Sequence, residues 1–162
     1  MVLLNKPYTE KEKCDFIVKY NHNMGYTIKQ TESGLEAIEP EKPSLNELKA
    51  KKKEEINQAR DKAEQGGFEY LGKVFDSDPI SCQRIALASQ TALMSKEKGL
   101  DFNIIWTCQD NSTIELDADK MIGVSLALTQ WSNTCHIKAS ELKLKVDDAT
   151  TEEELNNIEW EE

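Results

Sequence analysis

The longest regular pattern of hydrophobic positions runs from about residue 118 to residue 147. Apolar side chains first recur at alternating spacings of three and four, at Met121, Val124, Leu128, Trp131 and Cys135. After one extra residue the stripe continues at Ala139, Leu142 and Val146. The spacing predicts one helix of about 45 Å, at roughly 1.5 Å per residue, with a short heptad seam and then a stutter. The seam either packs inside the chain or makes an intermolecular contact, and the pattern leaves both open.

Three other segments have helical signals. Ser44 with Glu47 forms a capping box before a helix over residues 44–65, whose thin apolar stripe is typical of a connector or a bundle member. A second helix over residues 79–98 ends at Gly99, and its expected core residues are Ile80, Ile85, Ala88, Ala92 and Leu93. Thr151 with Glu154 predicts a last short helix that carries Leu155, Ile158 and Trp160.

Alternating apolar residues between these helices predict strands. Residues 68–75 are aromatic and β-branched, residues 102–108 alternate at Phe102, Ile104 and Trp106, and residues 112–116 return after a polar turn. We expect these three segments to form one antiparallel sheet that is covered by helices, with Trp106 substantially buried.

The first forty residues predict a separate small unit. Thr9 and Glu12 form a capping box, and the helix that follows should bury Cys14, Ile17, Val18 and Met24. Residues 26–30 and 35–39 alternate like a hairpin, and residues 2–4 are a candidate third strand. The expected fold is therefore α+β, with a helix and hairpin unit over residues 1–39, a proline linker and connecting helix over 40–65, and long helices on a three-stranded antiparallel sheet over 66–162.

Charge and hydropathy exclude several classes of partner. The 162 residues carry a net charge of −10 and include two arginines, which disfavours nucleic-acid binding because that needs a basic face. No apolar run approaches the roughly 20 residues that span a bilayer, and residues 1–7 lack the basic region and apolar core expected of a signal peptide. We therefore expect a cytoplasmic protein that binds neither nucleic acid nor membrane.

Side chains that would support catalysis or metal binding are scattered. The four cysteines form no C-x-x-C pair, and His136 points about 100° away from its neighbour Cys135 on a helix. The acidic clusters near residues 147–148 and 152–154 are explained by capping and helix-terminus electrostatics. We expect no catalytic residue, no cofactor and no metal, and hence a protein that is not an enzyme.

Four segments resemble a bacteriophage and prophage tail-associated domain family. They are residues 55–63 (EINQARDKA), 68–78 (FEYLGKVFDSD), 102–112 (FNIIWTCQDNS) and 116–123 (LDADKMIG). A closing segment, EEELNNIEW, extends the resemblance over about residues 54–160. The family occurs in tail-fibre and fibre-assembly proteins and brings no catalytic residues. The resemblance implies a tail protein that acts in fibre assembly or attachment, as a fibre chaperone or a fibre- or baseplate-associated component. It would work in the host cytoplasm during assembly or in the virion tail.

Two functions remain open at this stage. One is this tail role, with a fibre or baseplate protein as the partner and with self-association into a homo-oligomer. The other is a soluble acidic phage regulator or inhibitor that binds a host protein. For self-association or binding to a tail subunit, the sequence nominates the helical seam as the contact, through Met121, Val124, Leu128, Trp131 and Cys135.

Overall fold

The computed structural model describes residues 1–161, and these form two compact units, Met1–Ser44 and a second that begins at Leu45. Both units mix helices with antiparallel strands, which confirms the α+β class. The boundary differs from the expected division. Residues 39–44 hold no helix or strand, whereas the helix that was expected to act as a connector belongs to the second unit, because it packs along the longest helix there.

The first unit is a three-stranded sheet with one helix. The sheet order is β1-β3-β2, formed by β1 (Val2–Asn5), β2 (Thr27–Gln30) and β3 (Gly34–Ile38), so the candidate third strand is confirmed. Helix α1 (Glu10–Ile17) continues into one π-helical turn, η1 (Val18–His22). The predicted capping box is present, because Thr9 Oγ1 accepts from the Glu12 N–H at 3.2 Å and the Glu12 carboxylate accepts from the Thr9 N–H at 2.8 Å.

The core of the first unit differs from the predicted one. Cys14, Val18 and Met24 are exposed, and Phe16 is buried in their place against Leu35 and Ala37. Phe16 lies four residues before Tyr20, and the two ring centroids are 4.7 Å apart. The buried face of the helix therefore follows its aromatic residues, which bury more apolar area than Cys14 or Val18 would.

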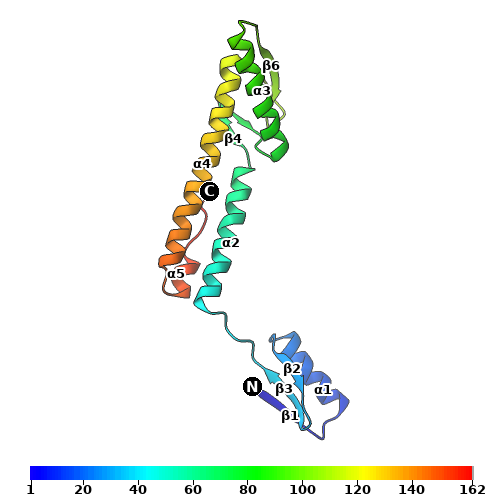
Figure 1. The fold of residues 1–162 in the computed structure, drawn as a ribbon. Helices are drawn as coiled ribbons and strands as arrows, with labels where there is room; N and C mark the ends of the chain where they lie inside the picture. The colour runs from blue at the N-terminus through cyan, green and yellow to red at the C-terminus, as the bar shows by residue number, and fades with distance from the viewer. Residues whose placement is uncertain (162) are drawn as a thin grey trace. The chain divides into compact units, whose positions relative to one another are not determined.

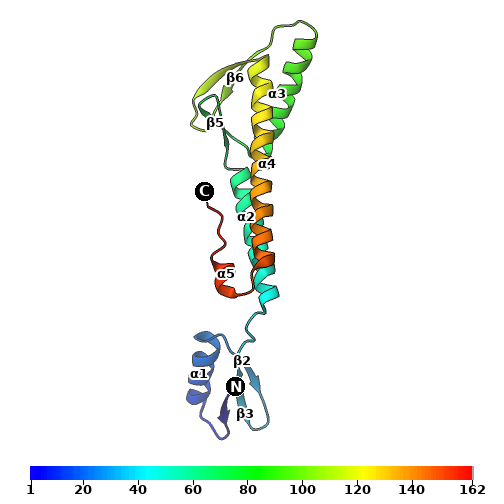
Figure 2. The same cartoon turned by 90° about the vertical axis from the view of Figure 1, so that its left-hand side faces the viewer.

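Helices dominate the second unit. They are α2 (Leu45–Glu64), α3 (Pro79–Glu97), α4 (Ala118–Asp148) and α5 (Glu152–Asn156), close to the predicted bounds. Helix α4 is the spine: α3 packs along its first half, and α2 and α5 lie beside its second half (Figure 1, Figure 2). Asp78 and Asp117 begin α3 and α4 by accepting hydrogen bonds from first-turn N–H groups at 2.9 Å.

The predicted three-stranded sheet of this unit is wrong. Its strands form two separate antiparallel hairpins, β4 (Phe68–Tyr70) with β5 (Lys73–Phe75), and β6 (Asn103–Thr107) with β7 (Thr113–Asp117). Residues 68–75 are split because Leu71 and Gly72 both have positive φ, 54° and 70°, as a tight two-residue hairpin turn requires. Leu71 is a poor residue for that conformation, so the sequence carries little sign of the turn.

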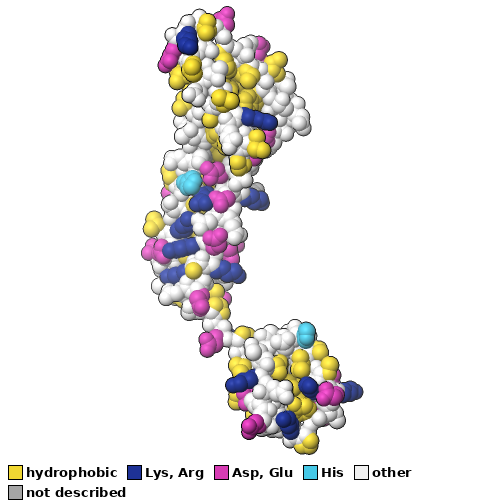
Figure 3. Space-filling view, turned by 45° about the vertical axis from the view of Figure 1, so that its right-hand side comes forward, with side chains coloured by type: hydrophobic (Ala, Val, Ile, Leu, Met, Phe, Trp, Pro, Cys, Tyr) yellow, Lys and Arg dark blue, Asp and Glu magenta, His cyan; other side chains and the backbone are white. Residues whose placement is uncertain are grey.

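Helix α3 keeps part of its apolar surface exposed. Ile85 and Ala92 are buried and Ala88 is half-buried, as predicted, but Ile80 and Leu93 are exposed instead of lying in the core. Figure 3 shows hydrophobic side chains gathered over the end of the second unit that carries α3 and β6, with few charged ones among them. Within the second unit, most of the Lys and Arg side chains in this view lie instead over α2 and the second half of α4.

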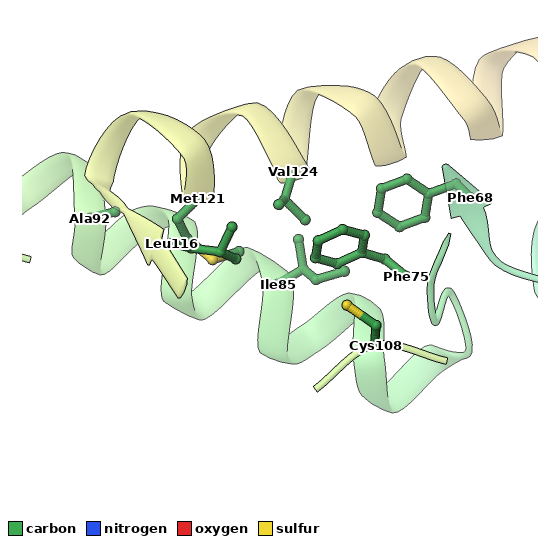
Figure 4. Packing of buried hydrophobic residues seen from close by; sticks show 8 residues of the cluster. All are labelled: Phe68, Phe75, Ile85, Ala92, Cys108, Leu116, Met121 and Val124. Carbon is green, nitrogen blue, oxygen red and sulfur yellow. The ribbon is translucent and has the colours of Figure 1, made fainter. Parts of the chain in front are cut away.

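Two hydrophobic clusters lie along α4. The first joins both hairpins to α3 and α4 (Figure 4), through Phe68, Phe75, Ile85, Ala92, Cys108, Leu116, Met121 and Val124. The second joins α2, α5 and the second half of α4, through Ile56, Ala139, Leu142, Val146, Ala149 and Leu155. The stutter in the apolar spacing, between Cys135 and Ala139, falls where α4 passes from the first cluster to the second. The shift in phase turns the stripe toward the new neighbour.

Candidate protein-binding groove

Three of the five residues in the helical seam that was nominated as a partner contact are buried inside the protein. Met121 and Val124 are fully buried, Cys135 is 2% exposed, and Leu128 and Trp131 are half-buried against the first cluster. Met121, Val124 and Cys135 are therefore out of reach of a partner in the folded chain, whereas a contact through Leu128 and Trp131 stays a prediction. The physical reason for the burial is that α3 and the two hairpins together cover the first half of α4, which one small sheet and one helix were not expected to do.

A groove with a volume of about 610 Å³ lies between α3 and strand β6. Its helix wall includes Leu87, Ala88 and Thr91, and its strand wall is the unbroken run of residues 104–109. Side chains alternate between the two faces of a strand, so a groove that meets every residue in turn runs along the edge of the strand. The volume is in the range of binding pockets for small molecules or short peptide segments.

The hydrogen-bond pattern shows which backbone groups face this groove. Trp106 pairs with Ile114, and the Cys108 N–H donates to the Ser112 carbonyl at 2.8 Å, so even-numbered residues bond across to β7. In an antiparallel ladder the residues between them point their N–H and C=O groups the other way. Asn103, Ile105 and Thr107 therefore direct their backbone groups to the open edge of β6. Within residues 1–161 no other segment pairs with the backbone of Ile105 or Thr107.

One end of this edge is already occupied. The Gln109 N–H points the same way as those of Ile105 and Thr107, and it donates to the Val74 carbonyl of β5 at 3.0 Å. The Gln109 side chain also donates to the Gly66 carbonyl at 3.0 Å, which holds the end of β6 against the β4–β5 hairpin. The chain itself thus places one strand residue against the edge of β6 and then leaves the rest of that edge open.

Apolar side chains on both walls are exposed to solvent. Ile105 is 73% exposed and Leu87 is 67% exposed. Trp106, which we expected to be substantially buried, is half-buried: it contacts the first cluster and also lines the groove. One signal in the sequence pointed here, since Ile105 interrupts the alternation of residues 102–108 by putting an apolar side chain on the outward face.

Two charged side chains line the groove, Arg84 from α3 and Asp76 from the segment after β5. Arg84 is exposed, and among residues 1–161 it has no hydrogen bond and no ion pair. The other arginine, Arg60, is held by the Asp61 carboxylate at 2.9 Å. The groove therefore presents an unpaired guanidinium, in a chain with a net charge of −10. Sequence reasoning did not single out Arg84, because the pairing of a surface charge depends on the fold.

The thiols of the second unit are held in their neutral form. Burial raises the pKa of Cys108, which lies at the end of the groove, and burial likewise raises the pKa of Cys82 and Cys135. His136 Nε2 lies 3.4 Å from a Glu64 carboxylate oxygen rather than beside a thiol. Among residues 1–161 no group of three or more His, Cys, Asp or Glu side chains is placed to hold a metal ion. Over the same residues no helix is both long and apolar enough to span a bilayer.

Fold and groove together define an α+β protein with a helical spine, two small hairpins and an open strand edge. A family model described as a domain of unknown function, DUF4376, matches residues 47–159, and the chain belongs to this family. The match begins within α2 and takes in α3, α4, α5 and both hairpins, so it covers the whole groove. No curated protein and no solved structure matches the chain.

Proposed function

We propose that this chain is a non-enzymatic bacteriophage tail protein that acts in tail-fibre assembly or attachment through protein–protein contacts. The groove between α3 and β6 would be its contact surface. The observation that carries the proposal is the combination of exposed apolar side chains with an open strand edge in one groove. Solvent-exposed apolar surface of this kind is common at protein-binding sites.

The resemblance to tail-associated domains supports the same surface. Two of the four segments that carry it, residues 68–78 and 102–112, contribute Asp76 and the whole strand wall of the groove. The partner on this proposal is a tail-fibre or baseplate protein, met in the host cytoplasm during assembly or in the virion tail. Self-association into a homo-oligomer belongs to the same proposal, and sedimentation would then give a mass above 18.4 kDa at micromolar concentration.

Co-expression with the tail-fibre and baseplate proteins of the same phage tests the proposal. The wild-type chain should co-purify with one of them, and Leu87→Glu should abolish this because it puts a charge on the helix wall of the groove. Leu144→Glu is the matched control: Leu144 is 65% exposed on α4, and it does not line the groove. Failure of the wild type to bind any fibre or baseplate protein would refute the tail role, and equal losses in both variants would refute the groove as the contact.

The alternative is a soluble regulator or inhibitor of a host protein, and the net charge of −10 favours it as a mimic of an acidic ligand. Mass spectrometry of purified virions and pull-down from uninfected host lysate separate the two proposals. A tail component is found in the particle, and an assembly factor binds the fibre protein without remaining there. A regulator instead binds one identified host protein and neither tail protein.

A further inference from the structure

We infer that the groove between α3 and β6 binds an extended peptide segment of a partner as an added β-strand on the edge of β6, with a carboxylate of that segment on Arg84. This inference rests on the proposed protein-binding function and specifies its chemistry. It concerns how the partner is bound, so it holds for a tail protein or for a host protein.

Within residues 1–161, the backbone of β6 has unpaired hydrogen-bonding groups along the groove. Ile105 and Thr107 each present an N–H and a C=O along the groove, and the next outward residue, Gln109, already bonds to Val74 at 3.0 Å. Edge groups of this kind are a template for another strand, and strand addition is an established way to bind extended peptides. The open part of the edge is about as long as β6, which at roughly 3.3 Å per residue spans about 16 Å and accepts four or five partner residues.

The helix wall of the groove carries apolar side chains. A strand that bonds to β6 sends alternate side chains to opposite faces of the small sheet. On one face they would meet α3 and the apolar residues Leu87, Ala88 and Phe102. On the other face they would meet solvent beside Ile105. The partner segment should therefore be apolar at every second position, which distinguishes it from an amphipathic helix with apolar residues at spacings of three and four.

The charge of Arg84 selects among extended segments. Arg84 has no hydrogen bond or ion pair among residues 1–161, and a guanidinium binds a carboxylate through two parallel hydrogen bonds. Arg84 is the one cation that lines the groove, so within the groove a carboxylate of the bound segment is favoured beside Arg84. Asp76, the other charged lining residue, opposes a second carboxylate near its own end of the groove.

A displayed library of random ten-residue peptides, selected on the full chain, tests the binding mode. The selected sequences should be apolar at alternate positions and should carry one Asp, one Glu or a free C-terminal carboxylate. The strongest binder is then synthesised as two peptides. In one, the backbone amides at odd positions are N-methylated, and in the other those at even positions, so that only one of the two sets faces β6. Methylation of the register that bonds to β6 should weaken binding at least tenfold, and methylation of the other register less than threefold.

Two measurements on the protein accompany the peptide series. In Arg84→Gln the affinity for the selected peptide should fall at least fivefold, and Asp76→Asn, the matched control, should leave it equal or tighter. Amide hydrogen exchange followed by NMR should show Ile105 and Thr107 becoming protected when the peptide binds. The amides of Ile104 and Trp106 should be protected already in the free protein, because they bond to β7.

Several results would overturn the inference. One is a peptide consensus with apolar spacings of three and four, and another is an equal loss of affinity when either register of amides is methylated. A third is that no selected peptide binds more weakly to the groove variants than to the wild type. The fourth is a dimer in which β6 pairs with β6 of a second copy. The failure of this inference is distinguishable from that of the proposed function. If a fibre protein co-purifies and loses binding in Leu87→Glu but is not displaced by the peptide, the function stands and strand addition fails. If the peptide binds as described and no tail protein co-purifies, strand addition stands and the tail role fails.

Discussion

Phe75 lies in the first hydrophobic cluster, which supports the groove between α3 and β6. Its replacement tests the packing of that cluster most directly. Its exposed fraction is zero, its ring lies 5.6 Å from that of Phe68 in a stacked arrangement, and it meets the Tyr70 ring edge-on at 6.2 Å. Its neighbour Val74 provides the carbonyl that accepts from Gln109. Loss of the Phe75 ring should therefore loosen both the core and the start of the open edge.

The expected cost follows from two contributions. Phe75→Ala removes a fully buried aromatic ring, which typically costs about 3–5 kcal/mol including the cavity that remains. Phe75→Leu keeps most of the apolar volume but loses two aromatic pairs, each worth about 0.5–1.5 kcal/mol, so we expect about 1–3 kcal/mol. A domain is stable by only about 5–15 kcal/mol, so the alanine variant should unfold at a much lower urea concentration.

The assay is urea unfolding followed by tryptophan fluorescence. All three tryptophans, at positions 106, 131 and 160, lie in the second unit, so the signal reports that unit and not the first. Val74→Ala is the control: Val74 is 42% exposed on the same strand, and the change should cost less than about 1 kcal/mol. A Phe75→Ala loss below about 1 kcal/mol at an unchanged m-value would refute the packing described for this cluster.

Three further predictions concern other parts of the chain. Hydrogen bonding from the first turn of α4 lowers the pKa of Asp117, so its ionised form stabilises the fold above the ordinary carboxyl pKa of about 4, and this stabilisation is lost as the pH falls through the lowered value. Asp117→Asn keeps the cap but does not titrate, and melts from pH 6 to pH 3 should show a smaller fall of Tm than in wild type. In the first unit, Gly34→Ala would put a Cβ 2.0 Å from the Leu4 carbonyl oxygen, so the NMR signals of the β1–β3–β2 sheet should broaden or disappear while those of the second unit stay. A thiol reagent should label the exposed Cys14 first in the native protein, and equal rates at all four thiols would contradict the burial and raised pKa values of Cys108 and Cys135.

Helices were predicted well because their ends are determined by neighbouring residues. The cap side chains accept hydrogen bonds from N–H groups two or three residues later in the chain, as seen at Thr9, Asp78 and Asp117. A few consecutive residues therefore determine where each of these helices begins. The strands were also placed at nearly the right residues. Their pairing was predicted incorrectly because it depended on a turn at Leu71, where a leucine takes a left-handed conformation that its side chain disfavours.

The groove could not be derived from the sequence, because it depends on which strand edge the tertiary fold leaves unpaired. Whether the backbone of Ile105 is free depends on which strands pair with β6, and the prediction of one three-stranded sheet gave no strand order and so did not identify its edges. Whether Arg84 is paired depends on which side chains the fold brings near it. The outward Ile105 was the one visible sign, because an isoleucine on the solvent face of a half-buried strand exposes apolar surface that folding does not use.

Burial disfavours association through Met121 and Val124 of the helical seam, but it does not disfavour association through the groove. Exposing Met121 and Val124 to pair with another chain would forfeit about 1.5–3 kcal/mol for each side chain, before the rest of the seam is counted. That loss is a large part of the stability of a domain, so a contact there competes with folding itself. The edge of β6, Leu87, Ile105 and Arg84 are already in solvent, so a strand that adds to β6 leaves the core in place. Association is therefore expected where folding leaves backbone groups, apolar side chains and one charge without partners.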